Sequence, residues 1–258
     1  MADLLYSLPD WLLLAIWAGS FGLLIIALPL LTHRVPWLRP SPENTDFVLR
    51  LQPTLFTVTS FVVAFTLFEA QNNIRKIDVL VSSEAAQINR LDRLLARYGD
   101  GSTSQARVHL LAYARSVIAE EWPEMLRGGN DRTQEAFVLV SRSIMALEPQ
   151  GHQMALHPET LRSVDSVAEA RELRLKGATA RLSATFWQTV LFAVLMLIFV
   201  SSAIERTPFR SIILACQMAV LGGFIGFVFI MDSPYKGENA VAPDAISRTL
   251  VAMEKREG

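Results

Sequence analysis

Residues 53–98 read PTLFTVTSFVVAFTLFEAQNNIRKIDVLVSSEAAQINRLDRLLARY, without a glycine and without a proline after Pro53. Residues 53–68 are apolar, and the residues that follow are polar. Steps of three and four residues select one seam with a period of 3.5, which is typical of helices that pack along their length. The seam is Phe56, Ser60, Val63, Leu67, Ala70, Ile74, Ile77, Val81, Glu84, Ile88, Leu91, Leu95 and Tyr98. The stretch predicts one helix of roughly 69 Å, about twice the 30 Å or so of a hydrocarbon core, so it continues beyond the membrane.

The composition indicates a membrane bundle joined to a soluble part. The chain has 258 residues, of which 51% are hydrophobic and 19% charged. It is too apolar for an ordinary soluble domain and too charged for a wholly embedded one. The formal net charge of −1 provides no basic field for nucleic acid, so we expect no nucleic-acid partner. The single cysteine, Cys216, excludes a disulfide within one chain.

Three further apolar runs are long enough to cross a bilayer. They lie at residues 11–31, 184–204 and 211–231. In the last run Gly222 and Gly226 are four residues apart, a spacing that suits close helix contact in lipid, with a hinge as the alternative. Ala15 with Gly19 and Ala18 with Gly22 show the same spacing in the first run. Three prolines predict a loop at residues 32–50, and we expect Pro53 in the first turn of the helix that follows.

The insert between the second and third spans, residues 69–183, should be an antiparallel helical bundle. It carries 15 acidic and 15 basic side chains, and its last helix, beginning near His157, is expected to run straight into the third span. The predicted fold is therefore all-α, with four transmembrane helices, a helical bundle between the second and third, and long helices continuous from membrane into bundle. We divide the chain into residues 1–68, 69–183, 184–231 and a tail, 232–258.

Each of the two seams of the insert is interrupted by one charged residue. These are Glu84 in the first long helix and Arg171 in the last. Antiparallel packing would bring both to a similar distance from the membrane, so we expect them to form a structural ion pair that fixes register. The alternative is that both lie at solvated edges and meet other partners, such as Arg174 or Glu169.

Two faces of the second span could line a pore. One carries Phe61, Phe65 and Phe68, and the other carries Thr59, Thr66 and Asn73. Packing of the aromatic rings against lipid or other helices is an equally good explanation for the first face.

Enzymatic and metal-binding motifs are not found. The four histidines have no close ligand spacing, and the chain has neither a glycine-rich phosphate loop nor a nucleophile elbow. We expect no enzyme, no metal and no cofactor. His152 and His157, which lie near Glu148 and Glu159, are better explained by a surface turn than by a metal site.

The N-terminus, the insert and the C-terminus should share one side of the membrane, because two spans precede the insert and two follow it. Basic residues near the spans number about seven on that side and about five on the other, which favours a cytoplasmic insert. The acidic N-terminus favours the opposite orientation, and the family resemblance described next decides for the cytoplasm.

The chain resembles the bestrophin family, and more narrowly the bacterial bestrophin-like membrane proteins. The resemblance rests on the four spans, the phenylalanine row, the segment Phe68, Glu69, Ala70, Asn72, Asn73 with Glu84 to Leu91, and Asp232-Ser-Pro-Tyr-Lys-Gly-Glu-Asn239. Where bestrophins have Pro-Phe-Gly, this chain has Pro234, Tyr235, Lys236 and Gly237, and the acidic run that binds calcium in animal bestrophins is absent.

The resemblance implies a homo-oligomer, pentameric in bestrophins, in the bacterial inner membrane, with membrane lipid and a permeant ion such as chloride as partners. Phe61, Phe65 and Phe68 would form the pore neck, Glu69, Asn72 and Asn73 its mouth, and Asp232, Pro234, Tyr235 and Gly237 a loop after the last span. An ion channel is the first functional hypothesis. The alternative is a membrane-anchored sensor or scaffold whose insert binds a ligand or partner without conduction.

Overall fold

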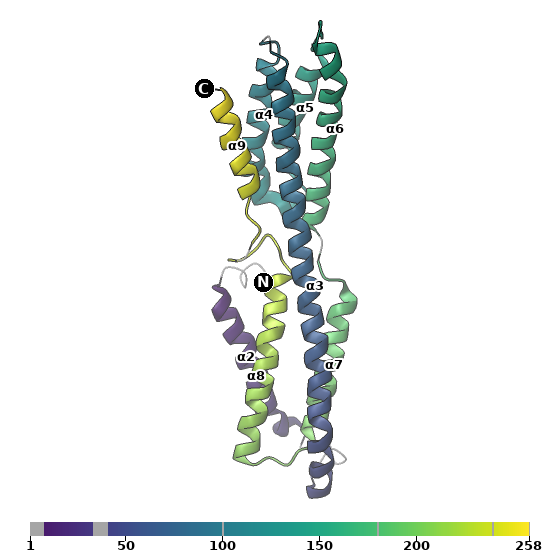
Figure 1. Ribbon diagram of the computed structural model, residues 1–258. Helices are drawn as coiled ribbons and strands as arrows, with labels where there is room; N and C mark the ends of the chain where they lie inside the picture. Colours follow the sequence, from purple (N-terminus) through teal and green to yellow (C-terminus); the bar gives the residue numbers. More distant parts are fainter. Residues whose placement is uncertain (1–7, 33–40, 100, 180, 239, 258) are drawn as a thin grey trace. The chain divides into compact units, whose positions relative to one another are not determined.

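A computed structural model describes residues 8–32, 41–99, 101–179, 181–238 and 240–257, and within them the chain forms helices and no strand (Figure 1). The elements are α2 (Asp10–Thr32), α3 (Pro42–Arg97), α4 (Ser104–Ser116), a π-helical turn η2 (Val117–Glu121), a 3₁₀ helix η3 (Trp122–Arg127), α5 (Asp131–Met145), α6 (Gln153–Ala178), α7 (Ala184–Ser202), α8 (Pro208–Met231) and α9 (Asp244–Glu257).

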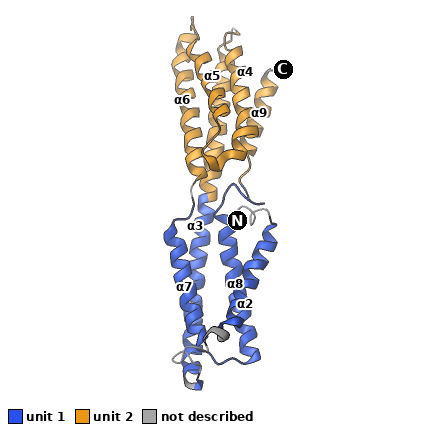
Figure 2. Cartoon of the chain, turned by 180° about the vertical axis from the view of Figure 1, so that it is seen from behind, with its two compact units in different colours: residues 1–73, 181–240 blue, residues 74–180, 241–258 orange. Residues whose placement is uncertain are grey.

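The chain forms two compact units (Figure 2). Unit 1 comprises residues 1–73 and 181–240, and unit 2 comprises residues 74–180 and 241–258. Helices α2, α3, α7 and α8 are long and apolar enough to cross a membrane. The all-α fold with a helical bundle between the second and third spans is confirmed, whereas the division into four segments stays a prediction.

Helix α3 contributes to both units and does not break near Glu69. Its length of 56 residues corresponds to about 84 Å at 1.5 Å per residue. No seam residue is exposed, and in unit 2 Ile77, Val81, Ile88, Leu91 and Leu95 are almost inaccessible to solvent. The seam that the 3.5-residue period selects is thus the face of α3 that packs against other helices.

The start of α3 differs from the prediction, because the helix begins at Pro42 and not near Pro53. Ser41 precedes it, and its hydroxyl accepts a hydrogen bond from the Asn44 amide at 3.2 Å. A proline in the first helical turn loses no intrahelical bond, so a capping serine followed by proline starts a helix. Pro53 therefore lies inside α3, where the helix continues past it. The loop predicted at residues 32–50 was too long.

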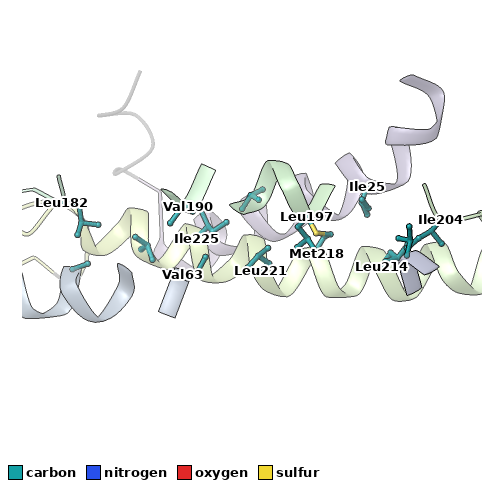
Figure 3. Close-up of a cluster of buried hydrophobic side chains, with 14 residues drawn as sticks. Ile25, Val63, Leu182, Val190, Leu197, Ile204, Leu214, Met218, Leu221 and Ile225 are labelled. Atoms are coloured by element: carbon teal, nitrogen blue, oxygen red, sulfur yellow. The ribbon is translucent and has the colours of Figure 1, made fainter. Parts of the chain in front are cut away.

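Unit 1 is held together by buried aliphatic side chains from its four helices (Figure 3). Helices α2 and α8 are in close contact at Gly222 and Gly226. A Cβ atom on Gly222 would come within 2.7 Å of the Trp17 carbonyl oxygen, and one on Gly226 within 2.8 Å of the Trp17 ring. The prediction of close packing at these two glycines is confirmed. Gly22 also faces α8, but a Cβ on Gly19 would meet nothing within 4 Å.

In unit 2, helices α4, α5, α6 and α9 gather around the second half of α3 (Figure 1). The C-terminal helix α9 packs back on this bundle, and its Ile246 and Met253 are fully buried. Asp92 of α3 accepts hydrogen bonds from Arg107 of α4 at 3.0 Å and from Arg256 of α9 at 2.7 Å. One buried carboxylate thus ties two helices to α3.

The expected continuation of the last insert helix into the third span is wrong. Helix α6 ends at Ala178, and α7 begins at Ala184 after Ser183, whose backbone is extended (φ −62°, ψ 149°). The amide of Leu182 donates to the Asp232 carboxylate at 2.7 Å instead of continuing the helical pattern. This side-chain acceptor lies 50 residues away in sequence, so the apolar period alone did not reveal the break.

Candidate functional site

The aromatic row of α3 is exposed in the single chain. The relative exposure is 75% for Phe61 and 55% for both Phe65 and Phe68. Of the three rings, Phe65 lies near another aromatic side chain, with its centroid 6.2 Å from that of Phe186 on α7. These residues lie in the part of α3 that is apolar enough to span a membrane. The row is therefore a surface that lipid, water or another subunit must cover.

The polar face of the same segment is packed inside unit 1. Thr45, Gln52, Thr59 and Thr66 recur every seven residues, and each is less than 9% exposed. The Glu205 amide donates to the Thr45 hydroxyl at 2.9 Å, and the Gln52 amide donates to the Gln217 side-chain oxygen on α8 at 2.6 Å. These bonds hold α3 against its neighbours in the unit. The sequence left open which face could line a pore; of the polar face, Thr59 and Thr66 are buried and Asn73 is half-buried.

Two apolar grooves adjoin the aromatic row. A groove of about 560 Å³ between α3 and α7 is lined by Phe61, Phe65 and Phe186, with four hydroxyl side chains among its other lining residues. A second groove of about 410 Å³ between α3 and α8 is lined by Phe56, Phe68 and Phe224. The aromatic side chains thus border open apolar surface on two sides of α3.

The predicted mouth residues follow the aromatic row directly. Glu69, Asn72 and Asn73 are all half-buried, and they lie at the end of the part of α3 that belongs to unit 1. Their role in a pore mouth stays a prediction.

The loop that follows α8 is hydrogen-bonded through Asp232 to residues at the start of α7. Both carboxylate oxygens of Asp232 are used: Oδ1 accepts from the Leu182 amide at 2.7 Å, and Oδ2 accepts from Trp187 Nε1 at 3.2 Å. A negative charge beside the start of α7 also complements the helix dipole. Pro234 is buried, Tyr235 is half-buried, and Gly237 adopts the left-handed φ of +81°. The loop therefore has a packing role in unit 1.

Unit 2 contains a buried ionic cluster that corrects the predicted ion pair. Glu84 binds Arg174, and Arg171 binds Glu121, so Glu84 and Arg171 do not pair directly. Arg174 also binds Glu121 and thereby joins the two pairs. Of the alternative, the partner Arg174 is correct for Glu84, but the solvated edges are wrong, because Glu84 and Arg171 are both buried. Arg171 instead binds Glu121 of η2, a residue that the periodic pattern of the sequence does not single out.

Arg174 has a partner at each of its guanidinium nitrogens. Nε and Nη2 donate to Glu84, Nη2 also donates to Glu121, and Nη1 donates to the sulfur of Met125. Its guanidinium carbon lies 5.5 Å from the centroid of the Trp122 ring. Arg174 is fully buried, so these contacts replace its hydration completely. Two arginines and two glutamates give the cluster a net charge of zero.

The π-helical turn explains how Glu121 enters the cluster. A π turn adds a residue to one helical turn, and it rotates the side chains that follow it. Within the turn Glu120 remains partly exposed, whereas Glu121 is fully buried. A signal in the sequence was the i, i+3 spacing of Arg171 and Arg174, which places both arginines on one face of a helix.

The protonation states follow from these contacts. Burial alone would raise the pKa of Glu121, but hydrogen bonds and charge from Arg171 and Arg174 outweigh burial and lower it. Burial, followed by the charge and hydrogen bond of Glu84, raises the pKa of Tyr113 well above its usual range. The Tyr113 hydroxyl therefore stays protonated and donates to Glu84 at 2.7 Å. The cluster is a fixed set of charges that holds α3, α4, η2 and α6 in register.

No cluster of three or more histidine, cysteine or acidic side chains able to hold a metal occurs in the part of the chain that the structure describes. His157 accepts or donates a hydrogen bond with the buried Tyr98 hydroxyl at 2.8 Å, and Cys216 is exposed on α8.

The chain matches the model of a known protein family. The Bestrophin-like domain matches residues 23–246. No curated protein matches the sequence.

Solved structures of membrane proteins share the fold. A variant of a bacterial bestrophin homologue from Klebsiella pneumoniae is 12% identical, with a TM-score of 0.64, over 95% of this chain and 98% of that one. A crystal structure described only as that of a membrane protein is 11% identical, with a TM-score of 0.63, over 93% of this chain and 98% of the other. At these identities the likeness establishes the fold.

Proposed function

Because the chain belongs to the family of the Bestrophin-like domain, we propose that it is an oligomeric ion channel of the bacterial inner membrane with a pore lined by α3. Phe61, Phe65 and Phe68 form the aromatic neck of this pore, and Glu69, Asn72 and Asn73 its mouth. A pentamer is the assembly that the family resemblance implies, with chloride as a candidate ion. The termini and unit 2 lie on the cytoplasmic side.

The exposed aromatic row carries this proposal. A helix that lines an axial pore must leave one face free along its length while its other faces are packed within its own subunit. The membrane segment of α3 has such a free face. Thr59 and Thr66 are buried within the subunit, whereas the aromatic row of Phe61, Phe65 and Phe68 is exposed. An aromatic ring presents a positive edge to an anion, and an apolar constriction can also close by losing its water.

The test is electrical recording from purified protein in planar bilayers. We expect the wild type to pass ions and Phe65→Ala to increase the conductance, because it widens the neck. Phe192→Ala is the matched control, since Phe192 is 64% exposed on α7 and outside the proposed neck. Equal currents in both variants would place the neck elsewhere. A wild-type bilayer that stays silent across voltage, pH and salt would favour the sensor or scaffold.

A further inference from the structure

The turn between α7 and α8 contains an arginine whose hydrogen bonding is incomplete. Arg206 lies in this turn, residues 203–207 of unit 1 (Figure 1), and its Nη2 atom donates to the Ser201 carbonyl oxygen at 3.2 Å. Its Nε and Nη1 atoms are buried, and no described residue accepts a hydrogen bond from either. The Ser201 hydroxyl, at the end of α7, is also buried without a partner among the described residues. Three polar atoms at one turn therefore have unused hydrogen-bonding capacity.

The charge of Arg206 is not offset by a carboxylate. Burial lowers the pKa of Arg206. The ion pairs that join described residues include neither Arg206 nor the neighbouring Glu205. A partly buried guanidinium group without a negative partner is costly, because it has lost part of its hydration and gained no attraction in exchange. The turn is therefore suited to binding an anion.

A second arginine lies at the same turn. Arg210, in the first turn of α8, donates from Nη1 to the Glu205 carbonyl oxygen at 3.4 Å. The Glu205 amide donates to the Thr45 hydroxyl at 2.9 Å, so the backbone of the turn is held from two sides. Thr207 caps α8 by accepting from the Arg210 amide at 3.2 Å. The cap satisfies the start of the helix, so the guanidinium groups, and not free helix amides, provide the binding capacity.

The donors of the turn suit a phosphate group. A phosphate carries several strong acceptor oxygens, so it can accept from separate nitrogens of one guanidinium group and from a second arginine. The turn joins two helices that are long and apolar enough to cross a membrane, which places it at the depth of lipid headgroups. Phe209, Ile212 and Ile213 are exposed on the first turns of α8, beside the two arginines. Acyl chains would cover these three side chains, which favours a lipid over a free anion.

We propose that Arg206, supported by Arg210, binds the phosphate group of an anionic phospholipid at the turn between α7 and α8. Arg206 is half-buried as a residue, so a rotation about its terminal torsions would bring its unpaired nitrogens to the headgroup. An anionic headgroup is preferred to a zwitterionic one, whose ammonium group offsets the phosphate charge. The inference depends on unit 1 alone and goes beyond the proposed function, because it does not require conduction.

The experiment measures the thermal midpoint and the lipid binding of the full-length protein in a neutral detergent. The added probes are dioleoylphosphatidylglycerol, dioleoylphosphatidylcholine and inorganic phosphate, and native mass spectrometry gives the affinity for each lipid. The test variant is Arg206→Gln. Arg50→Gln is the matched control, because Arg50 is an exposed arginine of the same unit outside the turn. Arg210→Gln is the second test variant, used if Arg206→Gln does not fold.

We expect phosphatidylglycerol to raise the wild-type midpoint more than the other two probes do. Arg206→Gln should bind phosphatidylglycerol roughly tenfold more weakly or worse, because it loses hydrogen bonds to a charged group, and Arg50→Gln should bind it like the wild type. Without added lipid Arg206→Gln should melt no lower than the wild type, since the cost of the unpaired charge is removed. A purely structural arginine would instead lower this midpoint.

Three results would overturn the inference. An unchanged affinity of Arg206→Gln for phosphatidylglycerol would remove the site. An equal loss of affinity in Arg50→Gln would mean that the lipid responds to surface charge in general. Equal stabilisation by inorganic phosphate and by phosphatidylglycerol would assign the turn to a soluble anion and exclude the lipid.

Discussion

Arg174→Met should be the most damaging single substitution in unit 2. Arg174 is fully buried and is the only cluster residue that binds both glutamates, so its loss leaves Glu84 without a cationic partner. Removing one partner from a buried ion pair costs about 3–5 kcal/mol, because the other charge stays buried. At about 4 kcal/mol the thermal midpoint should fall by roughly 8–16 °C.

Arg171→Met and Arg90→Met are the matched comparisons. Arg171 binds one glutamate, and Glu121 keeps Arg174 when Arg171 is lost, so we expect about half the effect of Arg174→Met. Arg90 forms an exposed ion pair, which contributes about 0–1 kcal/mol. Replacing Glu84 and Arg174 together with leucine should recover about half of the loss, because it leaves the neutral pair of Arg171 and Glu121.

The assay is circular dichroism of the full-length protein in detergent, combined with hydrogen exchange of residues 117–127 to localise the effect. A loss of stability for Arg174→Met no greater than that of Arg90→Met would refute the reasoning. An Arg171→Met variant less stable than Arg174→Met would show that the bridging role is assigned to the wrong arginine.

Three further predictions concern packing, capping and pH. Gly222→Ala should destabilise the pairing of α2 with α8 because its Cβ would overlap Trp17, whereas Gly223→Ala, with nothing within 4 Å, should melt like the wild type. Asp232→Ala should lower stability by about 1–2 kcal/mol and change tryptophan fluorescence, because it removes the acceptor of the Trp187 indole; unchanged emission would contradict that bond. The lowered pKa of Glu121 means that its contribution to stability is present above the ordinary glutamate pKa of about 4.3 and is lost as the pH falls through its folded pKa. Glu121→Gln should therefore show a weaker loss of unit 2 stability on acidification than the wild type, as followed by hydrogen exchange, and identical acid profiles would count against the assigned pairing.

Much of the architecture could be predicted from the sequence because it depends on local repetition. The seam repeats every 3.5 residues over the 43 positions from Phe56 to Tyr98, and its members all lie on the same packing face of the helix. The apolar runs of α2, α7 and α8 have the length that a bilayer requires. Gly222 and Gly226 owe their close contact to a four-residue spacing on one helix. These features depend on neighbours along the chain.

The site residues that could not be predicted depend on partners far apart in sequence. Glu121 lies in a π turn that directs its side chain into the cluster. It binds Arg171, so Arg171 does not pair with Glu84. The Asp232 carboxylate, 50 residues from Leu182 in sequence, accepts a hydrogen bond from the Leu182 backbone amide in the segment between α6 and α7. A periodic pattern gives the direction in which a side chain points, whereas the identity of its partner depends on how separate helices approach one another. The sequence therefore determined the long helix and its packing face, and only the tertiary structure decided which charges meet and which face of α3 stays open.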